Sequence, residues 1–244
     1  MKNRAVLSSI IRENYEKVLE RIQRAARSAG RGADEVRLVV VTKGQPLEKI
    51  QAVIEAGARR LGENYAEEGI EKIQALSALE GLEWYMIGHV QTRKARLVCE
   101  HFAWVHSLDS LKLAERLDRF AGELQRKLPV LIECNISGEE SKFGFPAWEE
   151  GGWDELGREI SAILQFKNLH VRGLMTMAPY STDPEAARPY FIRARRLRDA
   201  LARQFPALDW AELSMGMSGD FETAVEEGAT IVRIGEAIIG ARPG

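Results

Sequence analysis

Lys43 is the side chain with the clearest chemical potential, because it follows the short apolar run Leu38 to Val41 after a single threonine. A lysine at the end of a buried strand is costly unless it is paired or its pKa is lowered. Partial burial disfavours the ammonium form, and a neutral amine can attack a carbonyl carbon to form a Schiff base. Position alone, however, favours the simpler interpretation, in which the Lys43 ammonium group extends into solvent.

Two turns late in the chain change that balance. The segment Ser214 to Asp220 is small and Gly-rich with a helical pattern directly after it, and Gly235 follows Arg233 at the end of the last apolar run. Such turns can direct backbone N–H groups at an anion, and the helix dipole adds to the attraction. Ser218 or Asp220 could instead cap the following helix. A strand-end lysine, a Gly-rich turn and a strand-end arginine together indicate a phosphorylated carbonyl ligand.

The other polar residues at strand ends are less specific. Asn64 could contact a ligand or cap the helix expected after it. His89 and His106 could be catalytic, although a lone histidine is more often a hydrogen-bonded structural residue. The sequence has no His, Cys and carboxylate cluster with metal-ligand spacing and no Gly-x-Ser-x-Gly motif. We therefore expect no metal and no serine nucleophile.

The elements that must position these residues follow a pattern of alternation. Eight short apolar runs are separated by longer amphipathic stretches, and the runs are Leu38–Val41, Arg60–Gly62, Trp84–Ile87, Trp104–Ser107, Val130–Asn135, Val171–Thr176, Ala211–Met215 and Thr230–Ile234. The helical stretches are Leu47–Glu55, Tyr65–Leu76, Leu111–Arg126, Trp153–Leu164, Pro184–Gln204 and Phe221–Glu226. Strands alternating with helices predict a parallel sheet, and eight such units close a (β/α)₈ TIM-type barrel. In that fold, functional residues gather at the carboxyl ends of the strands.

An extra helix, Ser9 to Ala29, is expected before the first strand, with Gly30 as its stop. An open doubly wound sheet would use the same units, but no GxGxxG motif follows the first strand, which argues against a dinucleotide-binding version. The loop-rich segment Glu139 to Gly152 predicts a surface excursion. No linker or shift in composition divides the chain, so we expect one domain over residues 1–244.

The composition is that of an ordinary globular protein. The net charge of −2 gives no reason to expect nucleic acid or an anionic membrane as a partner. No apolar run approaches the roughly 20 residues of a membrane span, and the first residues lack a signal-peptide core. The two cysteines, Cys99 and Cys134, cannot form a disulfide framework. We therefore expect a cytoplasmic protein.

The same strand-end residues belong to a series of short motifs. In order, they are Val39–Lys43, Leu61–Tyr65, Trp84–Lys94, His106–Ser110, Asn135–Lys142, Arg172–Met175, Met177–Pro179, Leu213–Ser218 and Val232–Gly235. With these motifs the sequence resembles the pyridoxal phosphate homeostasis proteins, which are single-domain relatives of the alanine racemase N-terminal barrel. The resemblance covers essentially the whole chain.

The resemblance implies pyridoxal 5′-phosphate as the cofactor, held as a Schiff base on Lys43. It also implies that Arg233 faces the pyridine nitrogen and that the phosphate-binding turns contain Ser214, Gly216, Ser218 and Gly235. Asn64 stands in the second motif, so we include it among the expected cofactor contacts. The sequence departs from the family pattern at Gly44-Gln45-Pro46, at Gly219 and at Glu236, whose carboxylate should point away from a phosphate.

The function implied by the resemblance is intracellular homeostasis of pyridoxal phosphate, in which the protein holds the cofactor and passes it to apo-enzymes. Pyridoxal phosphate is the strongest electron sink when its ring nitrogen is protonated, and an arginine beside that nitrogen disfavours the proton. The resemblance further implies that alanine racemases use the lysine and a tyrosine from an added β domain as the two acid–base groups of racemisation. The end of this sequence at Gly244 leaves no room for such a domain. We therefore assign no catalytic residue and expect a monomer. A fold-type III racemase or lyase is the alternative, and a cofactor-free aldolase is a remote third.

Overall fold

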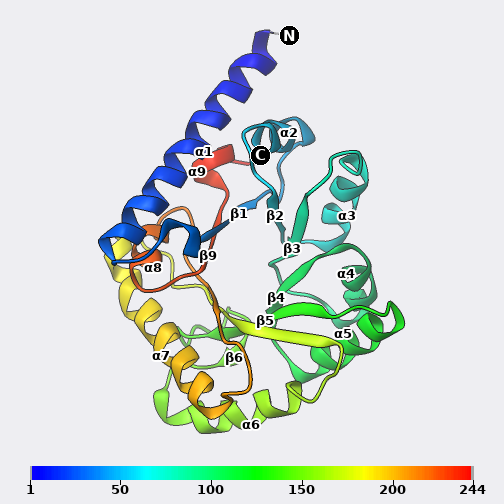
Figure 1. Cartoon of the computed structure of the whole chain (residues 1–244), viewed down its shortest axis with the longest axis vertical. Coiled ribbons are helices and arrows are strands. Elements are labelled where there is room, and N and C mark those ends of the chain that lie inside the picture. Colours follow the sequence, from blue (N-terminus) through cyan, green and yellow to red (C-terminus); the bar gives the residue numbers. More distant parts are fainter. Residues whose placement is uncertain (1, 243–244) are drawn as a thin grey trace.

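The computed structural model describes residues 2–242, and eight parallel strands close into a barrel (Figure 1). The strands are β1 (Arg37–Val41), β2 (Arg60–Glu63), β3 (Glu83–Met86), β4 (Trp104–Leu108), β5 (Leu128–Asn135), β7 (Leu169–Met175), β8 (Glu212–Ser214) and β9 (Ile231–Ile234). Each strand pairs with the next in this order, and β9 pairs with β1 to close the ring. The predicted barrel is confirmed, and each strand ends within two residues of its predicted bounds.

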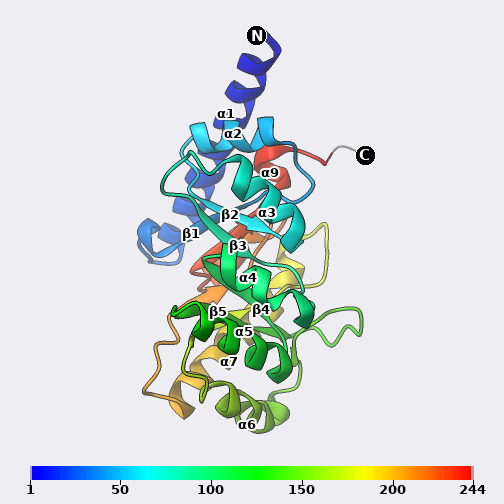
Figure 2. The ribbon, with the colours of Figure 1, turned by 90° about the vertical axis from the view of Figure 1, so that its right-hand side faces the viewer.

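Helices surround the barrel on its outside (Figure 1). They are α1 (Lys2–Ser28), α2 (Leu47–Glu55), α3 (Ala66–Ala75), α4 (Ala95–His101), α5 (Leu111–Glu123), α6 (Trp153–Ile163), α7 (Arg188–Gln204), α8 (Phe221–Glu226) and α9 (Glu236–Ile239). The extra N-terminal helix is confirmed, although α1 begins earlier than predicted, and its first turns extend beyond the barrel (Figures 1 and 2). The short helices α4 and α9 were not predicted from the sequence.

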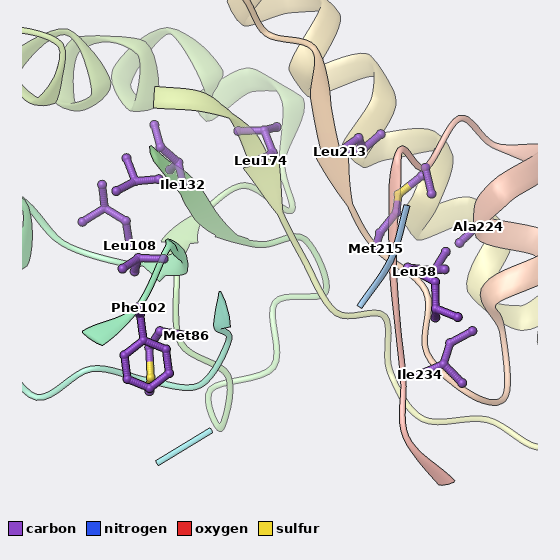
Figure 3. Packing of buried hydrophobic residues seen from close by; sticks show 14 of the residues in the cluster. Leu38, Met86, Phe102, Leu108, Ile132, Leu174, Leu213, Met215, Ala224 and Ile234 are labelled. Carbon is purple, nitrogen blue, oxygen red and sulfur yellow. The ribbon is translucent and has the colours of Figure 1, made fainter. Parts of the chain in front are cut away.

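The strands separate two apolar layers, because successive side chains of a strand point to opposite faces. On β1, Leu38 and Val40 belong to the large core between the strands and the helices, whereas Val39 belongs to a smaller cluster inside the barrel. Figure 3 shows the outer core, where strand residues such as Ile132 and Leu213 lie among buried apolar side chains. The fixed alternation determines which strand residues reach the barrel mouth.

The predicted surface excursion carries little regular structure. It contains the two-residue strand β6 (Phe145–Pro146), which pairs with the end of β5, and a 3₁₀ turn at Glu150–Gly152. Among the described residues, none of the helices combines the length and the apolar character that a bilayer span requires.

Candidate functional site

Strand alternation carries Lys43 to the mouth of the barrel. Val39 and Val41 lie on the interior side of β1, and Lys43 is the next residue in that series of every second position. Val41 and Lys43 line the same cavity. The Lys43 side chain therefore lies over the interior of the barrel at the carboxyl end of β1, which is the position that the sequence predicts.

The surroundings of Lys43 favour a neutral amine. Its pKa is lowered from the usual lysine value mainly because burial disfavours the ammonium form. The positive charges of Arg242 and Arg233 lower the Lys43 pKa further, whereas Glu63 and Glu68 act in the opposite direction. Lys43 is only partly exposed, and its side chain lines the cavity.

The cavity has a volume of about 520 Å³, which lies in the range typical of small-molecule sites. Its walls come from the ends of β1 and β9, from the turn after β8, and from the segment that follows α9. The residues that line it are Val41, Lys43, Gln45, Asn64, Ile87, Met177, Tyr180, Ser181, Met217, Ser218, Gly219, Asp220, Arg233, Gly235, Glu236, Ala237, Gly240, Ala241 and Arg242. Five of the seven predicted contact residues are among them.

Arg233 is held rigidly below this cavity. It is 4% exposed, and its guanidinium donates to Ser214 Oγ at 2.7 Å and to the Thr176 carbonyl oxygen at 2.9 Å. Burial lowers the pKa of Arg233 to about 10, although the negative charges of Glu133 and Asp220 oppose that shift. Arg233 therefore remains a cation at neutral pH, and its orientation is fixed before any ligand arrives.

Ser214 and Gly216 do not belong to the cavity lining. Ser214 is fully buried, and its Oγ lies between Arg233 and His106 Nδ1, 3.2 Å away. Gly216 is buried with a positive φ of 94°, and its carbonyl oxygen accepts from the Arg233 N–H at 3.0 Å. A Cβ on Gly216 would lie 2.6 Å from Ala224 Cβ. Both residues thus support Arg233, and their direct contact with a ligand stays a prediction.

The turn after β8 and the segment that follows β9 together form one wall of the cavity. Ser218 Oγ accepts from the Ala237 N–H at 3.3 Å, and this bond joins the two segments. The N–H groups of Ser218 and Gly219 make no hydrogen bond within residues 2–242, so they are free to face an anion. A Cβ on Gly235 would lie 2.9 Å from the Val41 carbonyl oxygen, so the close packing of β9 on β1 requires glycine.

Asn64, Ser218 and Asp220 were the possible helix caps, and of these only Asp220 occupies an N-cap position. Tyr65, not Asn64, occupies the N-cap position of α3, and Asn64 lines the cavity. Asp220 occupies the N-cap position of α8, where its carboxylate accepts from the Met217 N–H at 2.6 Å. Glu236, where the sequence departs from the family pattern, is exposed and lies at the rim of the cavity.

The two histidines considered as candidates, His89 and His106, lie outside the cavity lining. His106 is fully buried, and desolvation holds its pKa well below the usual value, so it is neutral. His89 Nδ1 lies 2.6 Å from Asp109 Oδ2, and its ring stacks on Phe143 with centroids 4.0 Å apart. His106 is thus held through one ring nitrogen by Ser214, and His89 through Asp109 and Phe143.

Several residues of the cavity lining, among them Gln45, Tyr180 and Arg242, were not predicted from the sequence as cofactor contacts. Gln45 Nε2 donates to the Gly240 carbonyl oxygen at 2.9 Å, which holds the C-terminal segment and Arg242 beside Lys43. Tyr180 lines the cavity from the loop after β7 and is 90% exposed. The contact between Gln45 and Gly240 joins positions 195 residues apart, so no local pattern could have revealed it.

Comparison with known proteins shows the family to which the chain belongs. The family model of the alanine racemase N-terminal domain matches residues 14–243. The "Pyridoxal phosphate homeostasis protein" of Vibrio alginolyticus is 42% identical over 238 residues, which cover 96% of this chain and 98% of the relative. The chain belongs to the family of pyridoxal phosphate homeostasis proteins.

Solved structures of this family and its fold relatives superimpose on the chain. PipY of Synechococcus elongatus, solved with pyridoxal phosphate bound, has a TM-score of 0.77 and 38% identity, and the match covers 84% of this chain and 93% of PipY. An alanine racemase of Clostridium difficile has a TM-score of 0.71 at 16% identity, and the match covers 95% of this chain but 58% of the racemase. The second likeness concerns the fold alone.

Proposed function

We propose that this protein binds pyridoxal 5′-phosphate reversibly through Lys43 and serves the intracellular homeostasis of that cofactor. The observation that carries the proposal is the partly buried Lys43 amine, which has a lowered pKa and faces a cavity with the fixed cation Arg233 at its base. The printed names of the relatives and the pyridoxal phosphate bound to PipY support the same cofactor.

The residues of the cavity fit the chemistry of this cofactor. When the Lys43 amine adds to the aldehyde carbon, one water molecule leaves and a carbon–nitrogen double bond remains, and the addition of water reverses the reaction. Ser218, Gly235 and the free N–H groups of the turn after β8 would hold the phosphate. Asn64, which directly follows β2, completes the proposed contacts.

Arg233 argues for holding the cofactor rather than using it. A guanidinium with a pKa of about 10 keeps its proton at neutral pH, so Arg233 can donate to a ring nitrogen but cannot accept its proton. Its hydrogen bonds to Ser214 and Thr176 prevent the side chain from turning away. We propose that Arg233 thereby disfavours the protonated ring, the form in which pyridoxal phosphate is the strongest electron sink.

We further propose that residues 1–244 act as one cytoplasmic, monomeric domain that passes the cofactor to apo-enzymes. Two free cysteines, both buried, are consistent with a reducing compartment. Transfer requires a way out, and the exposed Tyr180 and Glu236 at the rim leave the cavity in contact with solvent. Light scattering of the purified protein would test the monomer, and activation of an apo-enzyme would test transfer.

An absorption spectrum from roughly 300 to 500 nm, taken with and without added pyridoxal phosphate, tests the binding proposal. We expect a band near roughly 410–430 nm that is characteristic of such imines and that the Lys43→Ala variant loses. A colourless wild-type protein that stays colourless with excess pyridoxal phosphate would overturn it.

A racemase is the second candidate function, because Tyr180 lines the same cavity as Lys43. Racemisation needs an acid or base on each face of the substrate, and these two side chains could supply them. Incubation of the loaded protein with single amino-acid enantiomers tests this function. Turnover that is lost in both the Lys43→Ala and the Tyr180→Phe variant would replace the carrier proposal with the enzyme.

A further inference from the structure

A cluster of charged side chains lies directly beside Lys43 but outside the cavity. Lys72 of α3 donates to Glu63 Oε1 at 2.7 Å and to Glu68 Oε1 at 2.6 Å. Glu63 is fully buried and Lys72 is 6% exposed, so these are interior charges rather than a surface ion pair. Among residues 2–242, the cavity lining includes Lys43 but none of these three side chains.

The cluster holds the backbone on both sides of Lys43. On the preceding side, Lys72 Nζ donates to the Thr42 carbonyl oxygen at 2.6 Å, and the Thr42 hydroxyl donates to Glu63. On the following side, the Gly44 N–H donates to Glu68 Oε1 at 2.6 Å. Gly44 has a φ of +64°, a conformation that L side chains rarely adopt, so the chain turns sharply at this point.

Stability alone does not explain such an arrangement. Taking ionised groups out of water is expensive, and apolar residues of similar volume often replace a buried ion pair without loss of stability. The cost is visible at Glu63, because burial raises the pKa of its carboxyl while the hydrogen bonds from Lys72 and Thr42 oppose that shift. These charged groups make fixed hydrogen bonds to the Thr42 carbonyl oxygen and to the Gly44 N–H, which apolar residues could not make.

We propose that Glu63, Glu68 and Lys72 form a positioning cluster that fixes the Thr42–Gly44 backbone and thereby directs the Lys43 amine at the carbonyl carbon of its ligand. The inference rests on the proposed function, because it assigns the cluster to the covalent step on Lys43. A nucleophile that is misplaced by about 1 Å can lose about 100-fold in rate, so control of its backbone has a measurable consequence.

Glu68→Ala is the informative variant. The more obvious Lys72→Met would leave Glu63 buried without its countercharge and could prevent folding. The Glu68 side chain is 29% exposed, so its truncation removes the bond to the Gly44 N–H without emptying the core. Glu68→Gln keeps an amide oxygen as acceptor. Glu67→Ala is the matched control, because Glu67 lies on the same helix as Glu68 but pairs with Lys94, away from the Lys43 loop.

Two measurements separate positioning from binding. The rate of imine formation at saturating pyridoxal phosphate reports the covalent step, and the affinity for pyridoxine 5′-phosphate, which has no aldehyde, reports the cavity. For Glu68→Ala we expect a rate at least about 10-fold lower and an affinity for pyridoxine 5′-phosphate within about twofold of wild type. Glu68→Gln should recover most of the rate, and Glu67→Ala should match wild type in both measurements.

The outcomes distinguish this inference from the proposed function. A Glu68→Ala rate equal to that of Glu67→Ala would overturn the positioning cluster, and so would an equal loss of rate and pyridoxine 5′-phosphate affinity, which indicates a merely structural role. A wild-type protein that binds pyridoxine 5′-phosphate but forms no imine would overturn the proposed attachment to Lys43 and this inference with it.

Discussion

Ser214→Ala and Ser218→Ala form a pair of substitutions that separates support of Arg233 from contact with phosphate. The Ser214 hydroxyl is fully buried and accepts a charge-assisted bond from Arg233 at 2.7 Å, with His106 at 3.2 Å. Its removal leaves one nitrogen of a buried guanidinium without this partner, although the bond to Thr176 remains. Ser218 instead lines the cavity and is only partly buried.

The expected magnitudes follow from these environments. A hydrogen bond to a buried charged group contributes about 1.5–3 kcal/mol, so Ser214→Ala should lower the free energy of unfolding by about 2–3 kcal/mol. For a chain of this length, that loss corresponds to a Tm lower by about 4–12 °C. Ser218→Ala should change stability by only about 0.5 kcal/mol. It should, however, reduce the preference for pyridoxal phosphate over pyridoxal by about 10-fold, as expected for one bond to an ionised phosphate.

The assay combines urea unfolding of both variants with titrations of pyridoxal phosphate and of pyridoxal. Ser214→Ala should lose stability and keep the wild-type ratio of the two affinities, whereas Ser218→Ala should do the reverse. A Ser214→Ala variant with wild-type stability and a reduced preference for the phosphorylated ligand would refute the assignment of Ser214 to Arg233. It would instead support the direct phosphate contact that the family resemblance implies.

Three further outcomes are expected. Gly235→Ala should weaken pyridoxal phosphate binding and cost about 1–3 kcal/mol in urea unfolding, because its Cβ would lie 2.9 Å from the Val41 carbonyl oxygen; unchanged values would contradict this packing. The rate of imine formation should rise with pH through a midpoint below the usual lysine value of 10.5, since only the neutral amine reacts and the pKa of Lys43 is lowered; a midpoint at or above 10.5 in a pH profile would argue against it. Burial raises the pKa of Glu133 from 4.5 to about 7. Between these two values the folded protein retains a proton that the unfolded chain has released, so the contribution of Glu133 to stability should fall as pH rises from about 4.5 to about 7. Unfolding of Glu133→Gln across this range should lack that decline, and an identical pH dependence in both proteins would contradict the assignment.

The barrel could be predicted from the sequence because its signals are local. Each strand is a short apolar run between amphipathic stretches, as at Leu38–Val41, and the number of units indicates closure. The helices α4 and α9, of seven and four residues, were missed because such short segments show little helical period, whereas the six-residue α8 follows a Gly-rich turn that marks its start. The bounds of α1 also differed, because its first turns extend beyond the barrel.

The site was predictable only in part, for a different physical reason. Strand alternation and Gly-rich turns indicate from local sequence that Lys43, Ser218 and Gly235 lie near the barrel mouth, and all three line the cavity. The environment of Ser214 depends on His106, 108 residues away on another strand, and a long-range hydrogen bond leaves no local pattern. The hydrogen bond from the Gly44 N–H likewise goes to Glu68 on α3, where the sequence shows only an acidic first turn.

Reduction with borohydride, followed by peptide mass mapping, tests the attachment of the cofactor to Lys43 most directly. The wild-type protein, incubated with equimolar pyridoxal phosphate and then reduced, should carry one phosphopyridoxyl group on the peptide that contains Lys43. Lys43→Ala, with the same fold by circular dichroism, should carry none under the same conditions. A label on a different lysine in the wild-type protein, or an equal extent of labelling in Lys43→Ala, would contradict the assignment of Lys43 as the cofactor-binding residue.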